Sequence, residues 1–212
     1  MIRTRIYPAA WHVLVILLSV EIAIVSSLRY FTGSQEPPEP ILANSFATPF
    51  LVIHVIGGVA ALLAGPLQFV RAIRARWPVF HRATGRIYVA ACAIGAPSGF
   101  VLALGSVAGP MVSVGFAIPA VLCALFTWLG WRAAVERRFG EHREWMLRSY
   151  ATIAAAITLR LLIPGAAFLD LDFLAAYRVN SWLAWIINLA LVEYIIRRDR
   201  GSAATYGRPA NA

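Results

Sequence analysis

Six continuous apolar runs, each about 20 residues long, constrain the fold of this chain more than any other feature of the sequence. A helix of that length crosses the hydrocarbon core of a bilayer, which is about 30 Å thick. Because the runs do not alternate, membrane strands are excluded, and lipid cannot satisfy the edge of an open sheet. The runs lie near residues 8–30, 48–70, 87–107, 110–131, 147–168 and 180–197. We therefore predict an all-α, polytopic membrane helix bundle.

The composition agrees with a membrane location and with a single domain. Apolar residues make up 60% of the 212 residues and charged residues only 14%, whereas a soluble domain has about 25% charged residues. One six-helix transmembrane domain over residues 1–200 accounts for the length, and residues 201–212 form a polar tail that we expect to be disordered.

Arginine placement predicts the orientation. The chain has no lysine, so all 19 basic residues are arginines, and 16 of them fall before the first run, in the two inner loops or after the last run. Only Arg29 and Arg178 lie on the opposite side, and Arg160 lies inside a run. Basic residues in short loops stay in the cytoplasm, so both termini are predicted to be cytoplasmic. The basic face is expected to meet anionic lipid headgroups. Nucleic acid is not expected, because no aromatic-interleaved binding module accompanies the charge.

Three ordered motifs carry a resemblance to a known family. The first joins His54-x-x-Gly57-Gly58 to the run Gly65-Pro66-Leu67-Gln68-Phe69; the second is His81-Arg82-x-x-Gly85-Arg86-x-Tyr88; the third is His142-Arg143-x-Trp145-Met146-x-Arg148. Over roughly residues 45 to 165, the chain resembles the bacterial membrane-protein family catalogued as domain of unknown function 2306. The resemblance implies a multi-helix membrane fold and no particular activity.

Three ionisable residues inside the runs, Glu21, His54 and Arg160, lie at a similar depth, roughly 9–14 Å below the outer surface. Charged groups within a membrane usually face the bundle interior and a partner. Helical spacing supports an inward position for His54, because it shares a stripe of small or polar residues with Gly58, Ala61, Gly65 and Gln68. We therefore predict a buried polar pocket formed by Glu21, His54, Gln68 and Arg160.

Two interpretations of this pocket stay open. In the functional one, Arg160 binds a small anion, a quinone or a haem propionate, His54 carries a proton or ligates a metal, and Glu21 balances the charge. In the structural one, Glu21 and Arg160 form an ion pair with His54 hydrogen-bonded nearby.

A second candidate site lies at the inner ends of two runs. His81 and His142 are expected at matched depth on separate helices, as the two axial ligands of a b-type haem require. Arg82, Arg86, Arg143 and Arg148 would then neutralise its propionates. The pair is similar to the inner-haem ligands of the ascorbate-dependent di-haem transmembrane cytochromes. Those proteins carry a second histidine pair on helices two and four, and this chain has no histidine in its fourth run. The alternative is that these residues contact lipid phosphate.

The sequence favours a b-type haem-binding or redox membrane protein of the electron-transfer class, multi-pass in the plasma (inner) membrane. The alternatives are a small-solute or ion transporter that uses Glu21, His54 and Arg160, and an accessory membrane subunit without a catalytic site. The sequence contains no phosphate-binding glycine loop, no His-Glu-x-x-His motif and no Cys-x-x-Cys motif. It therefore indicates no particular enzyme activity, and whether the protein is an enzyme stays open. Cys92 and Cys123 fall within runs at similar depth, where apolar filler is the expected role.

Overall fold

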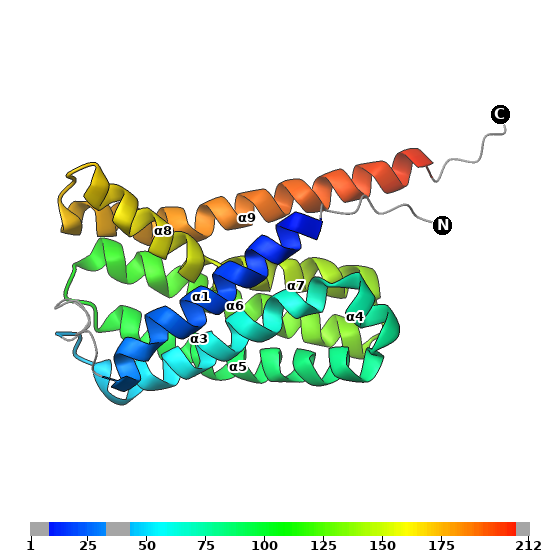
Figure 1. Cartoon of the computed structure of the whole chain (residues 1–212), viewed down its shortest axis with the longest axis horizontal. Helices are drawn as coiled ribbons and strands as arrows, with labels where there is room; N and C mark the ends of the chain where they lie inside the picture. Colours follow the sequence, from blue (N-terminus) through cyan, green and yellow to red (C-terminus); the bar gives the residue numbers. More distant parts are fainter. Residues whose placement is uncertain (1–8, 33–42, 207–212) are drawn as a thin grey trace.

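A computed structural model describes residues 9–32 and 43–206 and shows an all-helical bundle (Figure 1). Its helices, in chain order, are α1 (Ala9–Thr32), α3 (Ala47–Phe69), α4 (Arg71–Arg76), α5 (Pro78–Leu104), α6 (Pro110–Val135), α7 (Phe139–Ile153), α8 (Ala155–Phe168) and α9 (Phe173–Tyr206). The predicted fold class, a membrane helix bundle, is confirmed.

Five helical stretches of the described chain are long and apolar enough to cross a membrane, namely α3, α5, α6, α7 together with α8, and α9. In α1, which has 24 residues, the described apolar stretch is the shorter His12–Ile24. The count of six spans and the cytoplasmic position of both termini therefore stay predictions.

Several helix ends differ from the predicted runs. Helix α5 begins at Pro78, nine residues before the predicted start at 87, because proline suits the first position of a helix, where its missing N–H has no partner to lose. The loop after α3 contains the short helix α4, which the sequence did not predict. Helix α9 continues to Tyr206, beyond its predicted end at 197 and into the predicted tail; residues 207–212 lie outside the described residues.

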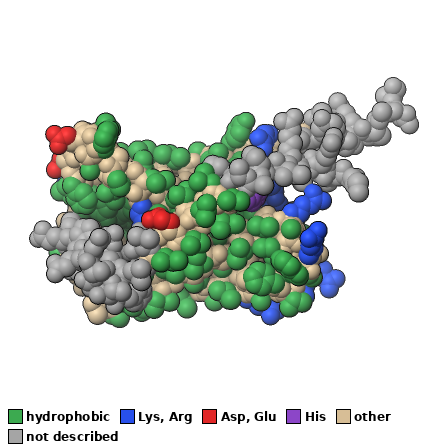
Figure 2. Space-filling model, in the orientation of Figure 1, with side chains coloured by type: hydrophobic (Ala, Val, Ile, Leu, Met, Phe, Trp, Pro, Cys, Tyr) green, Lys and Arg blue, Asp and Glu red, His purple; other side chains and the backbone are tan. Residues whose placement is uncertain are grey.

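Successive spanning stretches run antiparallel, with α7 and α8 together forming one of them (Figure 1). Helix α4 marks one end of the bundle, where α1 also begins and α9 ends; the α5–α6 hairpin and the α8–α9 connection mark the other (Figure 1). Following the predicted orientation, we call these the inner and the outer end. On the face seen in Figure 2, basic side chains gather at the inner end and acidic ones occur at the outer end; the band between them is largely apolar, apart from a small acidic and a small basic patch nearer the outer end. This distribution suits a bundle surrounded by lipid.

The packing of α3 against α5 positions the functional site. A Cβ atom on Gly57 would lie 2.8 Å from the Cα atom of Gly95 and 2.9 Å from the carbonyl oxygen of Ala91, so the two backbones touch at this point. Lipid supplies no hydrophobic force to hold helices together, and close backbone approach at small residues replaces it. Of the predicted stripe, Ala61, Gly65 and Gln68 are buried. The residue that touches the α5 backbone is Gly57, outside that stripe, whereas a Cβ atom on Gly58 would meet nothing within 4 Å.

Candidate functional site

A cavity of about 310 Å³ lies between α3, α5, α6, α8 and α9. Its wall includes Asn44 and Ser106 at the outer end and Cys92, Cys123 and Thr152 at its deepest part, which we call the floor. At 1.5 Å per helical residue, Cys92 lies about 18 Å below the outer end of α5, near the middle of the bundle. The volume is at the lower end of the roughly 300–1,000 Å³ that small-molecule sites occupy.

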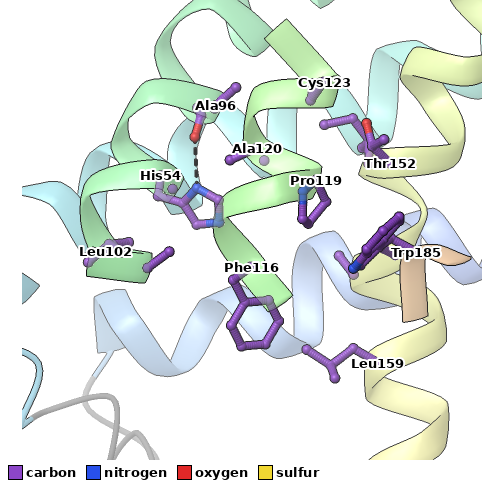
Figure 3. Close-up of a pocket in the computed structure, with 18 of the residues that line it drawn as sticks. His54, Ala96, Leu102, Phe116, Pro119, Ala120, Cys123, Thr152, Leu159 and Trp185 are labelled. Atoms are coloured by element: carbon purple, nitrogen blue, oxygen red, sulfur yellow. Dashed lines mark hydrogen bonds between the residues drawn. The ribbon is translucent and has the colours of Figure 1, made fainter. Parts of the chain in front are cut away.

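His54 projects from α3 into this cavity (Figure 3). His54 is surrounded by protein atoms, yet its side chain is exposed because it lines the cavity. The Nδ1 atom lies 2.9 Å from the carbonyl oxygen of Gly95 on α5, the bond drawn as a dashed line in Figure 3. Since a carbonyl oxygen can only accept, Nδ1 is the donor. Nε2 is then left as the ring nitrogen that can meet a ligand.

Two glycines of α5 make room for the imidazole ring. A Cβ atom on Gly99 would lie 2.8 Å from both Cε1 and Nδ1 of His54, closer than real Cβ atoms come to a neighbour. Gly95, one turn earlier, supplies the accepting carbonyl. The ring therefore rests on a glycine face of α5, and this face fixes its direction.

Arg160 reaches the same cavity from α8 on the opposite side. Its Nη1 atom donates to the carbonyl oxygen of Ala156 at 3.1 Å, which directs the side chain back along its own helix. The positive charge of Arg160 is close enough to interact electrostatically with the imidazole of His54. The structure thus brings together two of the four residues predicted for the outer pocket.

The other two predicted pocket residues, Gln68 and Glu21, do not line the cavity. Gln68 is buried near the inner end of α3, where its Nε2 atom donates to Thr84 Oγ1 at 2.7 Å, and it does not line the cavity. Glu21 is exposed on α1 and is likewise not part of the cavity wall. Helical spacing predicts that Gln68 and His54 share one side of α3. It does not show whether the cavity extends along the helix as far as Gln68.

A proline and a tryptophan shape the wall opposite His54 (Figure 3). Pro119 has no N–H group, so the carbonyl of Gly115, one turn earlier in α6, loses its helical partner. Trp185 of α9 replaces it, with Nε1 donating to that oxygen at 3.0 Å. Both rings line the cavity, and the bond couples α9 to the proline turn of α6.

The floor of the cavity holds the two cysteines, which the sequence assigned to apolar filling. Cys92 of α5 and Cys123 of α6 are both buried, belong to one cluster of buried residues and are close enough to interact. The signal for this contact was available: the two residues lie at nearly equal distances from the hairpin that makes α5 and α6 antiparallel neighbours.

The inner cluster is only partly assembled as predicted. His81 lies in the first turn of α5 and His142 in the first turn of α7, and the two are close enough to interact electrostatically. His142 Nδ1 lies 2.8 Å from the carbonyl oxygen of Gly130, which accepts, while His81 Nδ1 is buried without a hydrogen-bond partner among the described residues. Neither of the two described cavities includes either histidine.

The inner arginines divide into two pairs. Arg148 donates to both carboxylate oxygens of Glu193, at 2.5 and 3.1 Å, and its guanidinium lies 4.7 Å from the centre of the Trp145 ring. Arg143 donates to Asp199 at 2.9 Å. Arg82 and Arg86 are exposed. Two of the four arginines expected to hold propionates are therefore bound to carboxylates of α9, and this arrangement does not favour a haem between His81 and His142.

The sequence as a whole matches one family model over residues 51–196, that of the predicted membrane proteins DUF2306. The chain belongs to this family. The match covers most of the chain and agrees with the resemblance that the three motifs carry. No curated protein and no solved structure matches the chain.

The DUF2306 match extends from α3 into α9 and therefore includes the cavity residues His54, Cys92, Cys123 and Arg160 as well as the inner cluster. Helix α1, with Glu21, lies outside it. In this family member, the first motif supplies the cavity histidine and the glycine contact with α5. The second and third motifs supply the inner histidines and arginines.

Proposed function

We propose that this DUF2306 protein binds a small amphipathic molecule in the cavity, with the polar head of the ligand between His54 and Arg160. One observation carries the proposal: a histidine and an arginine from separate helices, α3 and α8, face the same mainly apolar cavity within the bundle. A charged group inside a span costs a few kcal/mol on insertion scales, and such groups usually line a path or a site.

The chemistry of the two side chains limits the ligand. Arg160 can only donate hydrogen bonds, so the head needs an oxygen that accepts them. His54 Nε2 accepts when the ring is neutral and donates when it is charged, so the head can exchange a proton there. Phe116, Leu159 and Trp185 supply apolar wall for a tail or ring. Isoprenoid-type quinones and anionic amphiphiles with a phosphate or carboxylate head meet these requirements.

The extent of the cavity favours binding over passage. Its outermost lining residues are Asn44 and Ser106, and its deepest are Cys92, Cys123 and Thr152 in the middle of the bundle. A transporter conformation would need a continuation toward the inner end, where Tyr88, Ser149 and Met146 pack without exposure. We therefore place the protein among membrane proteins that bind or react with a lipid-soluble ligand, in the plasma (inner) membrane.

The basic inner face adds a lipid contact to this proposal. Burial, with Arg143 and Arg71 nearby, lowers the pKa of Arg74 on α4, so these positive charges repel one another. Anionic lipid headgroups beside α4 would relieve that repulsion.

Native mass spectrometry of the detergent-purified protein tests the binding proposal. The probes are a fully substituted 1,4-benzoquinone with a short alkyl tail and an alkyl phosphate with the same tail. We expect one molecule of at least one probe per chain. His54→Ala and Arg160→Leu should each weaken binding about tenfold or more, since one lost hydrogen bond of about 1.4 kcal/mol corresponds to that factor.

Two matched variants serve as controls. His142→Ala removes a histidine that also donates from Nδ1 to a glycine carbonyl but does not line the cavity. Arg178→Leu removes an exposed arginine of α9 that is not part of the cavity wall. Both should bind like the wild type. If neither probe binds, or if the controls weaken binding as much as the cavity variants, the proposal is wrong.

A further inference from the structure

The floor of the cavity contains a pair of thiols from neighbouring helices. Cys92 of α5 is 1% exposed and Cys123 of α6 is 4% exposed, and both belong to the same buried cluster as Tyr88. Both side chains line the same cavity, and the two thiols are close enough to interact. They are the only cysteines of the chain. The two side chains lie at one level of neighbouring antiparallel helices, as a disulfide between α5 and α6 requires.

Four hydroxyl groups surround the thiol pair. Tyr88 Oη lies 2.8 Å from Ser149 Oγ, and Thr127 Oγ1 lies 2.7 Å from the same oxygen. Thr152 Oγ1 donates to the backbone carbonyl of Ser149 at 2.6 Å. The hydroxyls lie close enough to the two sulfurs to interact with them, and Tyr88 belongs to the same buried cluster as both cysteines.

Such an arrangement differs from apolar filling. Burying a hydroxyl group costs free energy unless it is hydrogen-bonded, and a purely packing role for two cysteines would need none of these groups. Hydroxyl donors around a sulfur stabilise the thiolate, which is the reactive form in disulfide chemistry. The surroundings of the two cysteines are therefore more polar than packing alone would require.

The cavity gives a ligand access to the sulfurs. Cys92, Cys123 and Thr152 line the same cavity as His54 and Arg160, and Figure 3 shows Cys123 and Thr152 on the wall that the cavity shares with Trp185. A molecule whose head lies between His54 and Arg160 is thus in a continuous space with the thiol pair.

We propose that Cys92 and Cys123 form a redox-active dithiol that reduces a quinone bound in the cavity. The inference rests on the proposed function and names the quinone as the ligand class. A dithiol gives up two electrons and two protons when it closes to a disulfide. Quinones are the lipid-soluble molecules that take up the same number of each.

The reaction balances without another reactant. Two S–H bonds break and one S–S bond forms, so the thiol pair is oxidised. The two electrons enter the quinone ring, and the two protons end on its two oxygens, which gives the hydroquinone. Arg160 donates to a quinone oxygen before transfer, and His54 Nε2 accepts from a hydroxyl of the product.

Thiol counting on the wild-type protein tests the inference. The protein is reduced, freed of reductant and incubated without oxygen with an excess of the fully substituted benzoquinone, which has no free ring position for thiol addition. Denatured samples are then labelled with a maleimide. We expect the labelled thiols to fall from two to none per chain, with one quinone reduced per chain by its absorbance. Cys92→Ser and Cys123→Ser should each bind quinone and reduce none.

The binding measurement separates this inference from the proposed function. If native mass spectrometry shows quinone bound while both thiols stay labelled, the redox inference is wrong and the binding site stands. If quinone neither binds nor oxidises the thiols, the redox inference is also wrong, and the proposed function depends on the alkyl phosphate result alone. Quinone reduction by a single-cysteine variant at the wild-type rate would also overturn the redox inference. Circular dichroism verifies that these variants keep the helical fold.

Discussion

The imidazole of His54 on α3 is fixed by the backbone of Gly95 on α5, with 2.9 Å between Nδ1 and the carbonyl oxygen. This bond crosses the helix contact on which the bundle depends, because Gly57, nearly one turn further along α3, touches Gly95 directly. The geometry of the candidate site and the packing of two spanning helices therefore share the same residues. A change on either helix affects both, and well-chosen variants can separate the two effects.

Gly99→Ala should impair ligand binding with little loss of folding. The new methyl group would lie 2.8 Å from the His54 ring, so the ring must turn away and its bond to Gly95, worth about 1 kcal/mol, is weakened. We expect a several-fold increase in the dissociation constant of the cavity ligand in native mass spectrometry. Gly165→Ala is the control, since nothing lies within 4 Å of a Cβ atom there. Equal affinities in the two variants would show that the ring position does not matter.

Gly57→Ala and its neighbour Gly58→Ala should differ sharply in stability. At Gly57 the added atom meets the backbone of α5 at 2.8 Å and no side chain can move aside, whereas at Gly58 it meets nothing within 4 Å. Overpacking of this kind costs about 1–3 kcal/mol. Thermal unfolding in detergent should show a lower midpoint for Gly57→Ala and an unchanged one for Gly58→Ala. Similar midpoints would contradict the backbone contact between α3 and α5.

Glu193→Gln should destabilise the contact between α7 and α9. Glu193 accepts two hydrogen bonds from Arg148, whose side chain is only 14% exposed, so the change removes the bonded carboxylate and leaves only Glu144, at 3.8 Å, as a counter-charge. We expect a loss of about 1–3 kcal/mol in the free energy of unfolding. Arg148→Lys should not preserve the wild-type value, because an ammonium group cannot bind a carboxylate through two parallel bonds. Wild-type stability in either variant would rule out a structural role for the pair.

The turn between α6 and α7 should lose stability at acid pH. Hydrogen bonds from Arg132 and Arg138 lower the pKa of Glu136 from its ordinary value of 4.5. A carboxyl group with a lowered pKa stabilises the fold above its ordinary pKa, and the contribution disappears as the pH falls through the lowered value. Below about pH 4.5, the midpoint of thermal unfolding should therefore fall less steeply with decreasing pH in Glu136→Gln than in the wild type. The effect should be small and weaken with salt, since these side chains are exposed. A steeper acid decrease in the variant would contradict this assignment.

The topology is testable without a structure. Sixteen inner arginines against two outer ones predict that a reporter fused at residue 212 lies in the cytoplasm and one inserted in the loop near residues 31–46 lies outside. An activity that requires the periplasm and a fluorescence that requires the cytoplasm give opposite signals for the two fusions. Signals from the same side would contradict the six-span count.

How far the sequence predicted the site depends on the residue. Depth along each run predicted His54 and Arg160 at one level, because the rise per helical residue is fixed, and both residues line the cavity. The same arithmetic could not show that Glu21 is exposed on α1 or that Gln68 bonds Thr84 near the inner end. At the inner end, His81 and His142 were expected near the starts of the runs at 87 and 147, and the structure places them in the first turns of α5 and α7, which begin earlier. The partners of Arg143 and Arg148 come from α9, more than 40 residues away.

By itself, the sequence determined the class of this protein, its spanning helices and the charge difference between its two ends, since the thickness of the bilayer and the cost of unpaired backbone groups in lipid leave little choice. The family motifs were also visible in it. Only the tertiary structure decided that His54 lies on the glycines of α5, that Cys92 meets Cys123 and that both share a cavity with Arg160. These contacts depend on how helices rotate and tilt against one another. That choice is made by the packing of many small side chains together, and no single run of the sequence contains it.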